Sequence, residues 1–347
     1  MQWEVTPSRA KCLGRTARVD GALWLSYSAS GAEWTFFGTK CTVELAGDAM
    51  SGDPVHAPRY AVEADGRRAA EGTVGRDGRA VVTVECPDAG MHVVRVLKLS
   101  ESADSTMGIV AISCEEEPAA TPDLPLYIEF IGDSITCGYG VDGVLGELYR
   151  TANEDATKGY AYLTAKALGA DYSLVSMSGY GIISGYTETG VIRPECTVPP
   201  LYTTMGDSYG AFAGKLSPRE TGWDFSRQPD IIVINLGTND ASYCGDNPER
   251  RREYIDAYRA FLAEVRSHNA KAEIVCILGT MDQRLCESVK TAVSEYSEQS
   301  GDGRAAYFGM PLQDMERDGA AVDWHPSAVS HGKAAAVLTE YLRTITA

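Results

Sequence analysis

The chain has 347 residues, of which 44% are hydrophobic and 23% charged, and its formal net charge is −17 at pH 7. This length exceeds that of a typical single domain, so we expect two domains with substantial cores. Nucleic acid binding needs clustered Lys and Arg side chains, and the acidic balance argues against it. The densest basic run, Arg250 to Arg252, is flanked by glutamates and predicts a solvated helix face. We therefore expect no nucleic acid partner.

The sequence also lacks the patterns of membrane and export segments. No apolar stretch approaches the roughly 20 residues that cross a bilayer, and Met1 to Glu4 do not begin a basic and then apolar leader. The nine cysteines are scattered, odd in number and without a Cys-x-x-Cys pair, which indicates reduced thiols. We expect a cytoplasmic protein with no membrane partner; secretion is the alternative, if a signal peptide has been removed.

Short apolar segments punctuated by turns fill the first third of the chain. Turn signals such as Ser30-Gly31 and Arg76-Asp77-Gly78 separate them, and this spacing predicts an antiparallel β-sandwich domain over residues 1–118. Residues 115–122 combine three glutamates with two prolines, which predicts an extended connector. The expected strands are 23–28, 34–38, 41–46, 60–64, 81–86, 92–99 and 109–114.

Apolar runs alternate with helical patterns over residues 124–347. Ile231 to Ile234 are apolar on both faces, as in a parallel sheet covered by helices, so we expect a doubly wound α/β domain. Residues 181–228 hold Gly, Pro, Tyr and Ser in irregular order, and we expect them to shape a cleft. The expected strands are 127–132, 172–177, 230–236 and 273–278, and the expected helices are 158–168, 250–267, 286–299 and 331–344.

Four polar or glycine residues lie where such a sheet keeps its chemistry, just beyond the carboxyl ends of its strands or before the last helix. Ser134 follows the first strand, Gly179 the second and Asn239 the third, and His325 precedes the last helix. A serine becomes a nucleophile only with a base and with donors for the developing oxyanion. His325 supplies an imidazole, and the Gly179 N–H and the Asn239 amide supply donors.

These residues stand in motifs that resemble the four blocks of the SGNH (GDSL-type) hydrolase superfamily, in the order that the superfamily uses. The resemblance implies that Ser134 is the nucleophile and His325 the base, with the Gly179 N–H, the Asn239 side chain and the Ser134 N–H as oxyanion donors. The four motifs are Gly132-Asp133-Ser134, Ser178-Gly179, Gly237-Thr238-Asn239-Asp240 and Asp323-Trp324-His325-Pro326.

The longer block from Phe130 to Gly140, the Asp-Trp-His-Pro form of the last block and the preceding β domain resemble carbohydrate esterase family 2. That family removes O-acetyl groups from plant polysaccharides and joins a jelly-roll domain to an SGNH domain. The resemblance implies a jelly-roll-like sandwich and a serine esterase that deacetylates hemicellulose, mannan or xylan, as polymer or oligosaccharide, through an acetyl-enzyme and without a cofactor. Two alternatives stay open: a carbohydrate-binding protein with an inactive hydrolase fold, and an SGNH lipase or thioesterase. The excess of 18 Tyr over 7 Phe favours stacking on sugars.

The last block departs from a common form of the superfamily. In many members the carboxylate that orients the histidine lies three residues before it, where this chain has Val322. Asp323, two residues before His325, is the nearest acid, and we expect its carboxylate to orient the imidazole. The alternative is a backbone carbonyl, which leaves a Ser-His dyad.

Three alternative functions, namely dinucleotide binding, metal binding and thiol catalysis, lack the neighbouring residues that they require. Gly138 to Gly143 satisfy Gly-x-Gly-x-x-Gly, but they begin six residues after Gly132, and the next strand ends without the acid that a ribose needs. The five histidines show no metal-ligand spacing, so we expect no metal. Cys137 has no base spaced for it and is predicted to be a buried thiol.

Overall fold

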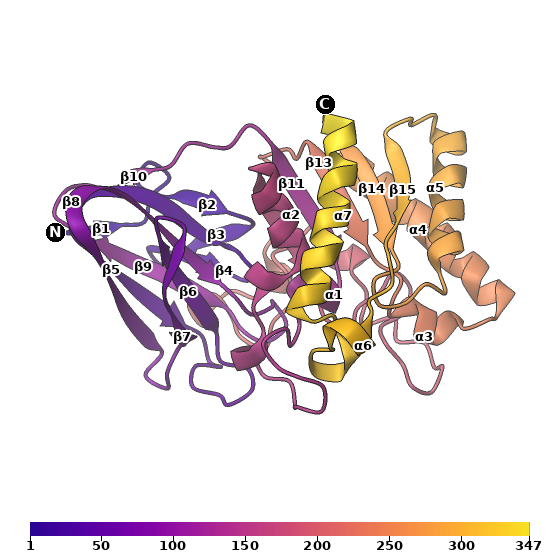
Figure 1. Cartoon of the computed structure of the whole chain (residues 1–347), viewed down its shortest axis with the longest axis horizontal. Helices are drawn as coiled ribbons and strands as arrows, with labels where there is room; N and C mark the ends of the chain where they lie inside the picture. Colours follow the sequence, from indigo (N-terminus) through magenta and orange to yellow (C-terminus); the bar gives the residue numbers. More distant parts are fainter. Residues whose placement is uncertain (347) are drawn as a thin grey trace.

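The computed structural model describes residues 1–346, and within them the chain forms two sheets placed side by side along its long axis (Figure 1). The N-terminal residues form an antiparallel ten-stranded sheet, and the C-terminal residues form a parallel five-stranded sheet flanked by helices. The two parts share buried apolar contacts, because Leu13, Leu97 and Leu99 pack in one cluster with Ile128 and Phe130. The β-sandwich followed by a doubly wound α/β unit agrees with the predicted fold class.

The first sheet has the strand order β3-β4-β9-β5-β8-β6-β7, with β1 on β9 and with β2 and β10 on β5. The two-residue strand β10 comes from the expected connector, so part of that segment belongs to the sheet. The strands are β1 Gln2–Glu4, β2 Lys11–Leu13, β3 Thr16–Val19, β4 Ala22–Leu25, β5 Gly31–Gly47, β6 Arg59–Ala64, β7 Arg67–Thr73, β8 Arg79–Lys98, β9 Met107–Ser113 and β10 Ala119–Ala120.

Two long strands each replace a pair of strands that we expected to be separate. The expected strands 34–38 and 41–46 are both part of β5, and 81–86 and 92–99, apart from its last residue, are both part of β8. β5 and β8 pair over most of their lengths; the register shifts between Gly38 and Lys40, where residues 86–89 of β8 lie outside the pairing, and Gly38 has a φ of +138°. At this bulge the ribbon bends without ending. One half of β5 pairs with β2 and β10 and the other half with β9, so the bent ribbon belongs to both layers of the sandwich. Trp34, Val43 and Val94 are among the residues buried between the layers.

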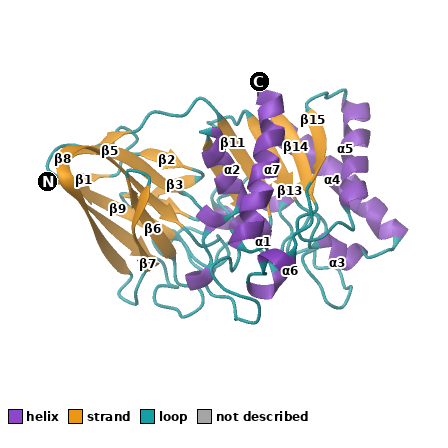
Figure 2. Cartoon of the chain, viewed as in Figure 1, coloured by secondary structure: helices purple, strands orange, loops and turns teal. Residues whose placement is uncertain are grey.

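The second sheet has the parallel order β12-β11-β13-β14-β15. Helices α2 and α7 lie on one face, and α4 and α5 lie on the other (Figure 2). The edge strand β15 and the short helices were not expected. The strands are β11 Tyr127–Gly132, β12 Asp171–Ser176, β13 Ile231–Asn235, β14 Glu273–Leu278 and β15 Ala305–Gly309; the helices are α1 Ser134–Cys137, α2 Tyr160–Leu168, α3 Asp240–Cys244, α4 Pro248–His268, α5 Cys286–Ser300, α6 Met315–Asp318 and α7 Ala328–Thr346.

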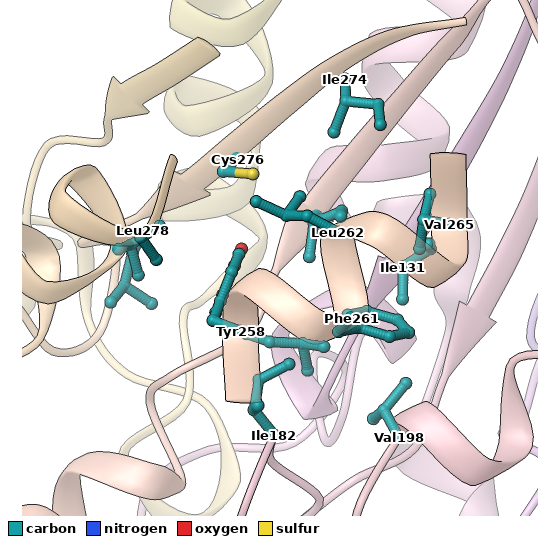
Figure 3. Packing of buried hydrophobic residues seen from close by; sticks show 14 of the residues in the cluster. Ile131, Ile182, Val198, Tyr258, Phe261, Leu262, Val265, Ile274, Cys276 and Leu278 are labelled. Carbon is teal, nitrogen blue, oxygen red and sulfur yellow. The ribbon is translucent and has the colours of Figure 1, made fainter. Parts of the chain in front are cut away.

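Successive strand residues bury opposite faces of this sheet. Phe261 and Leu262 of α4 pack with Ile131 and Ile274 on one face (Figure 3). Phe130, the neighbour of Ile131, belongs to the cluster on the other face with α2 and α7. Every residue of β11, β12 and β13 is buried, which is the pattern of a parallel sheet covered on both faces.

The strand order creates a switch point between β11 and β13. The chain runs from β11 to β12 on one side and then crosses to β13 on the other side. In open α/β sheets, ligands bind beyond the carboxyl ends of the strands at this kind of switch point. Ser134 lies two residues beyond the end of β11, and Asn239 follows β13, so two expected site residues flank the switch point. Over residues 1–346, no helix combines the length and the apolar character that a membrane crossing requires.

Candidate active site

Ser134 is the first residue of the short helix α1, immediately beyond β11. The Asp133 carboxylate caps the helix by accepting the Ile135 N–H at 3.1 Å. A Cβ on Gly132 would lie 2.0 Å from the Thr136 hydroxyl oxygen, so a glycine is required at this sharp turn. The turn leaves the Ser134 side chain at the end of the sheet with 7% of its surface exposed.

His325 contacts Ser134 directly. Its Nε2 lies 2.7 Å from the Ser134 Oγ, and its Nδ1 lies 3.0 Å from the carbonyl oxygen of Val322. With Nδ1 carrying the proton and donating to that carbonyl, Nε2 is free to accept the hydroxyl proton. Burial lowers the pKa of His325, so the ring is neutral near pH 7 and can act as a base.

The Asp323 carboxylate makes a different contact from the expected one. It accepts a hydrogen bond from the Tyr139 hydroxyl at 3.0 Å, while the Val322 carbonyl occupies the position beside His325 Nδ1. The cause is the backbone: Asp323 and Trp324 have φ values of +51° and +66°, and the tight turn 322–324 brings the Val322 carbonyl to the ring. Of the two interpretations of this block, the structure therefore shows the backbone carbonyl.

The glycines of the Gly-x-Gly-x-x-Gly pattern make room for this turn. A Cβ on Gly140 would lie 2.5 Å from the Val322 Cβ, and one on Gly143 would lie 2.6 Å from the Val322 Cγ2. Gly140 also has a φ of +60°, which favours glycine. These glycines therefore leave the space that the loop carrying His325 occupies, and the pattern does not form a dinucleotide-binding turn.

The expected oxyanion donors gather beyond β12 and β13. The Asn239 Nδ2 donates to the Tyr180 carbonyl at 2.8 Å and reaches the Asp133 Oδ2 at 3.4 Å, so the amide lies beside the residue that precedes the nucleophile. Gly179 has a φ of +78°. Among residues 1–346, the Ser134 and Gly179 N–H groups have no hydrogen-bond partner, which leaves both available to a substrate oxygen.

Two buried acids support this edge of the sheet. Asp240 accepts the N–H groups of Ile182, Ile183 and Ser184 and so fixes the loop after Gly179; burial raises its pKa to about 6. Burial also raises the pKa of Asp133 to about 7. Both carboxylates accept backbone N–H groups, so they act here as structural caps.

Cys137 does not provide a competing nucleophile. Its side chain is fully buried, and burial raises the pKa of the thiol well above its ordinary value, so the thiol stays protonated. Its sulfur lies 3.2 Å from the Ser176 hydroxyl.

Two residues near the site escaped sequence reasoning. The Tyr139 ring packs 4.4 Å from the His325 ring and stacks on Tyr149 at 4.2 Å, with 8° between the ring planes. Tyr139 lies five residues beyond Ser134, inside the block from Phe130 to Gly140 that carries the family resemblance, but nothing in the sequence assigned it a role of its own. Glu101 lies in the loop between β8 and β9 of the N-terminal part and accepts the Ser178 N–H at 2.7 Å. Nothing in the sequence near Glu101 marks this role.

A hollow of about 310 Å³ opens beside Gly179. Segment 181–228, which we expected to shape a cleft, supplies part of its wall. Tyr209 at its edge is 70% exposed, and Trp324 beside His325 is 57% exposed. The lining residues include Ala103, Ser178, Gly179, Tyr180, Arg193, Asp207 and Tyr209.

Both parts of the chain match known families. Residues 130–332 match the GDSL-like Lipase/Acylhydrolase family, and residues 12–122 match the Carbohydrate esterase 2 N-terminal family. The chain is 31% identical over 276 residues to an acetylxylan esterase / glucomannan deacetylase of Cellvibrio japonicus, covering 74% of this chain and 70% of that protein. It is 29% identical over 326 residues to the cellulase/esterase CelE of Acetivibrio thermocellus, covering 92% of this chain but only 37% of CelE.

The fold is similar to a solved structure over its whole length. The acetyl xylan esterase Est2A from Butyrivibrio proteoclasticus superposes with a TM-score of 0.89 at 26% identity, covering 100% of this chain and 98% of that one. The likeness includes the sandwich as well as the parallel sheet, so the arrangement of both parts is common to the two proteins.

Proposed function

We propose a function for this chain, which belongs to the GDSL-like lipase/acylhydrolase family and is a family 2 carbohydrate esterase. In this proposal it removes O-acetyl groups from plant hemicellulose, mannan or xylan, through an acetyl-enzyme on Ser134. The observation that carries the proposal is the 2.7 Å contact between Ser134 Oγ and His325 Nε2 beside unpartnered backbone N–H groups. This is the arrangement of an activated nucleophile next to an oxyanion site.

The proposed reaction has two steps. Ser134 Oγ attacks the acetyl carbonyl carbon while its proton passes to His325 Nε2; the ester C–O bond then breaks, and the sugar oxygen leaves with that proton. A water molecule next gives a proton to His325 and attacks the acetyl carbon, which releases acetate and restores the serine. The Ser134 and Gly179 N–H groups and the Asn239 amide stabilise the oxyanion in both steps.

The surroundings of the site suit a sugar better than a long acyl chain. Exposed aromatic rings, Tyr209 and Trp324, offer flat surfaces on which a sugar face stacks. The hollow beside Gly179 is lined by the charged side chains of Arg193 and Asp207 together with aromatic side chains, a combination that offers hydrogen-bond partners to sugar hydroxyl groups as well as stacking surfaces. The names of the relatives, acetylxylan esterase and glucomannan deacetylase, support the same class of substrate. These features favour the esterase over a lipase or thioesterase.

The direct test is acetate release from acetylated mannan, acetylated xylan and their oligosaccharides, with NMR of the acetyl groups that remain. We expect release from at least one of these polymers and its loss in Ser134→Ala. Binding of the polysaccharides without any release, together with no turnover of 4-nitrophenyl acetate, would instead support the binding-module alternative.

A further inference from the structure

The loop between β8 and β9, residues 99–106, is polar and yet buried. Ser100, Glu101, Ser102 and Asp104 have at most 4% of their surfaces exposed. The loop belongs to the first sheet but lies against the second part of the chain, since the Glu101 N–H donates to the Glu154 Oε2 at 2.8 Å. Burying polar side chains is costly unless their hydrogen bonds are satisfied, so we expect the polar side chains of this loop to have specific partners in the second part of the chain.

Glu101 is the residue of this loop that reaches the oxyanion segment. Its Oε2 accepts the N–H of Ser178 at 2.7 Å, and Ser178 directly precedes Gly179. The Glu101 backbone is fixed on two sides, because its carbonyl oxygen accepts the Lys98 ammonium at 2.7 Å and its N–H binds Glu154. A carboxylate held this firmly gives the Ser178 peptide a defined position.

The Gly179 N–H needs this support on its N-terminal side. The φ of Gly179, +78°, lies in the left-handed region, and a Cβ there would meet nothing within 4 Å; its carbonyl oxygen accepts the Tyr186 N–H at 2.9 Å, which holds the peptide on its C-terminal side. Glycine populates several backbone regions at similar free energy. The Gly179 N–H belongs to the peptide that joins Ser178 to Gly179, so its direction depends on how Ser178 is held, and an oxyanion donor acts only when it is already oriented.

We propose that Glu101 is a positioning residue for the reaction: by holding the Ser178 N–H, this side chain of the β8–β9 loop keeps the Gly179 N–H aimed at the oxyanion, so the active site is completed by both parts of the chain. The proposal rests on the proposed acyl transfer at Ser134. It concerns the hydrogen-bond acceptor of Glu101 and not its charge.

The charged groups around Glu101 indicate that its side-chain oxygen, as a hydrogen-bond acceptor, matters for this role and that its negative charge does not. The Glu101 and Glu154 carboxylates and the Cys137 sulfur lie within 4.8 Å of one another, Asp104 lies in the same loop, and Lys98 is the cation among them. Burial and the neighbouring Asp104 charge raise the pKa of Glu101 to about 7. A glutamine, which is neutral and keeps a side-chain oxygen, therefore fits the site.

The test uses a reaction that needs the oxyanion site but not the natural substrate. Diethyl 4-nitrophenyl phosphate phosphorylates a catalytic serine: the serine oxygen bonds to phosphorus, 4-nitrophenolate leaves, and the histidine takes the serine proton. We would measure the rate of the mass gain on the full chain by intact mass spectrometry, with Ser134→Ala as the blank. The steady-state kcat and KM for 4-nitrophenyl acetate would be measured beside it.

Three variants separate the acceptor from the charge. Glu101→Gln keeps an acceptor and is expected to stay within about 3-fold of wild type. Glu101→Leu removes the acceptor, and Glu101→Asp withdraws it by one methylene; both are expected to lose roughly 10- to 100-fold in the phosphorylation rate and in kcat, with little change in KM. Should Glu101→Leu fail to fold, Glu101→Asp carries the same prediction.

Glu33→Leu is the matched control, because Glu33 is also a buried glutamate of the first sheet but binds Arg95 and Thr121. It is expected to keep the wild-type rates. The proposal is overturned if Glu101→Asp, or a folded Glu101→Leu, reacts as fast as wild type, or if Glu101→Gln loses as much as Glu101→Leu. If wild type is phosphorylated on Ser134 but deacetylates no polysaccharide, the substrate proposal fails while the role of Glu101 is still decided.

Discussion

The Nδ1 atom of His325 lies 3.0 Å from the carbonyl oxygen of Val322, in the position where many serine hydrolases place a carboxylate. A carbonyl oxygen fixes the orientation and tautomer of the ring as a carboxylate does, but it brings no full negative charge. In the proposed mechanism Ser134 and His325 therefore act as a dyad, while the Asp323 carboxylate influences the ring through its charge and accepts a hydrogen bond from Tyr139.

This arrangement predicts a mild effect of Asp323→Asn. Loss of the aspartate from a true triad lowers kcat by about 10⁴-fold, whereas we expect less than roughly a 10-fold loss here, because the Val322 carbonyl remains in place. The measurement is kcat for 4-nitrophenyl acetate, with His325→Ala as the inactive reference. A loss in Asp323→Asn as large as that in His325→Ala would show that the carboxylate orients the ring in solution.

The acid limb of the pH–rate profile reports the same histidine. His325 must be neutral to accept the serine proton, so kcat/KM rises with pH through the pKa of this ring in the free enzyme. Burial lowers that pKa below its ordinary value of 6.5, which places the limb below pH 6.5. The nearby Asp323 charge raises the pKa, so Asp323→Asn should move the limb to lower pH. A limb above pH 6.5, or a shift in the opposite direction, would be inconsistent with this electrostatic picture.

Asn239→Ala tests the side-chain donor of the oxyanion site. Removing one such donor commonly costs about 10²- to 10³-fold in kcat, and we expect a loss in this range with a smaller change in KM. Because Asn239 also binds the Tyr180 carbonyl, thermal unfolding of the variant should be measured in parallel. Near-normal turnover in a folded Asn239→Ala variant would remove Asn239 from the proposed mechanism.

Gly140→Ala tests whether the space beside Gly140 is needed to position Val322 and the loop that carries His325. The new Cβ would lie 2.5 Å from that of Val322, so we expect the Val322 carbonyl to shift and kcat to fall more than 10-fold. Gly146→Ala is the control, since Gly146 also has a positive φ of 93° but open space around it. Both variants should lose about 1–2 kcal/mol of stability from the left-handed backbone; Gly140→Ala should lose more because of the contact with Val322, and only Gly140→Ala should lose activity. Equal activities in the two variants would argue against the contact.

Much of the second part of the chain could be predicted because its signals are local. The apolar runs that became β11, β12, β13 and β14 are continuous and stand apart from the helical patterns, and the motifs with Ser134, Gly179 and Asn239 follow the first three of them. Strand β15 was missed because Ala305–Gly309 is a short edge strand that is only partly buried. Strand β7 was missed because its sequence, Arg-Arg-Ala-Ala-Glu-Gly-Thr, alternates between exposed and half-buried positions without a strong apolar face.

The remaining differences concern geometry that residue types do not encode. Whether an aspartate or a carbonyl faces His325 depends on the positive φ values of Asp323 and Trp324, which the sequence pattern does not reveal. Glu101 lies 77 residues from Ser178 in the chain, and only the packing of the two sheets brings them together. Sequence reasoning therefore found the residues proposed for the chemistry but not those that hold them in place.

The most direct test of the account is to identify the acylated residue. Wild-type protein would be mixed with 4-nitrophenyl acetate, quenched in acid during turnover and digested, and the peptides would be mapped by mass spectrometry. We predict one acetyl group on Ser134, with a higher fraction in a variant that slows deacylation, and none at this position in Ser134→Ala. Acetyl transfer to a different residue, or full esterase activity in Ser134→Ala, would contradict the account.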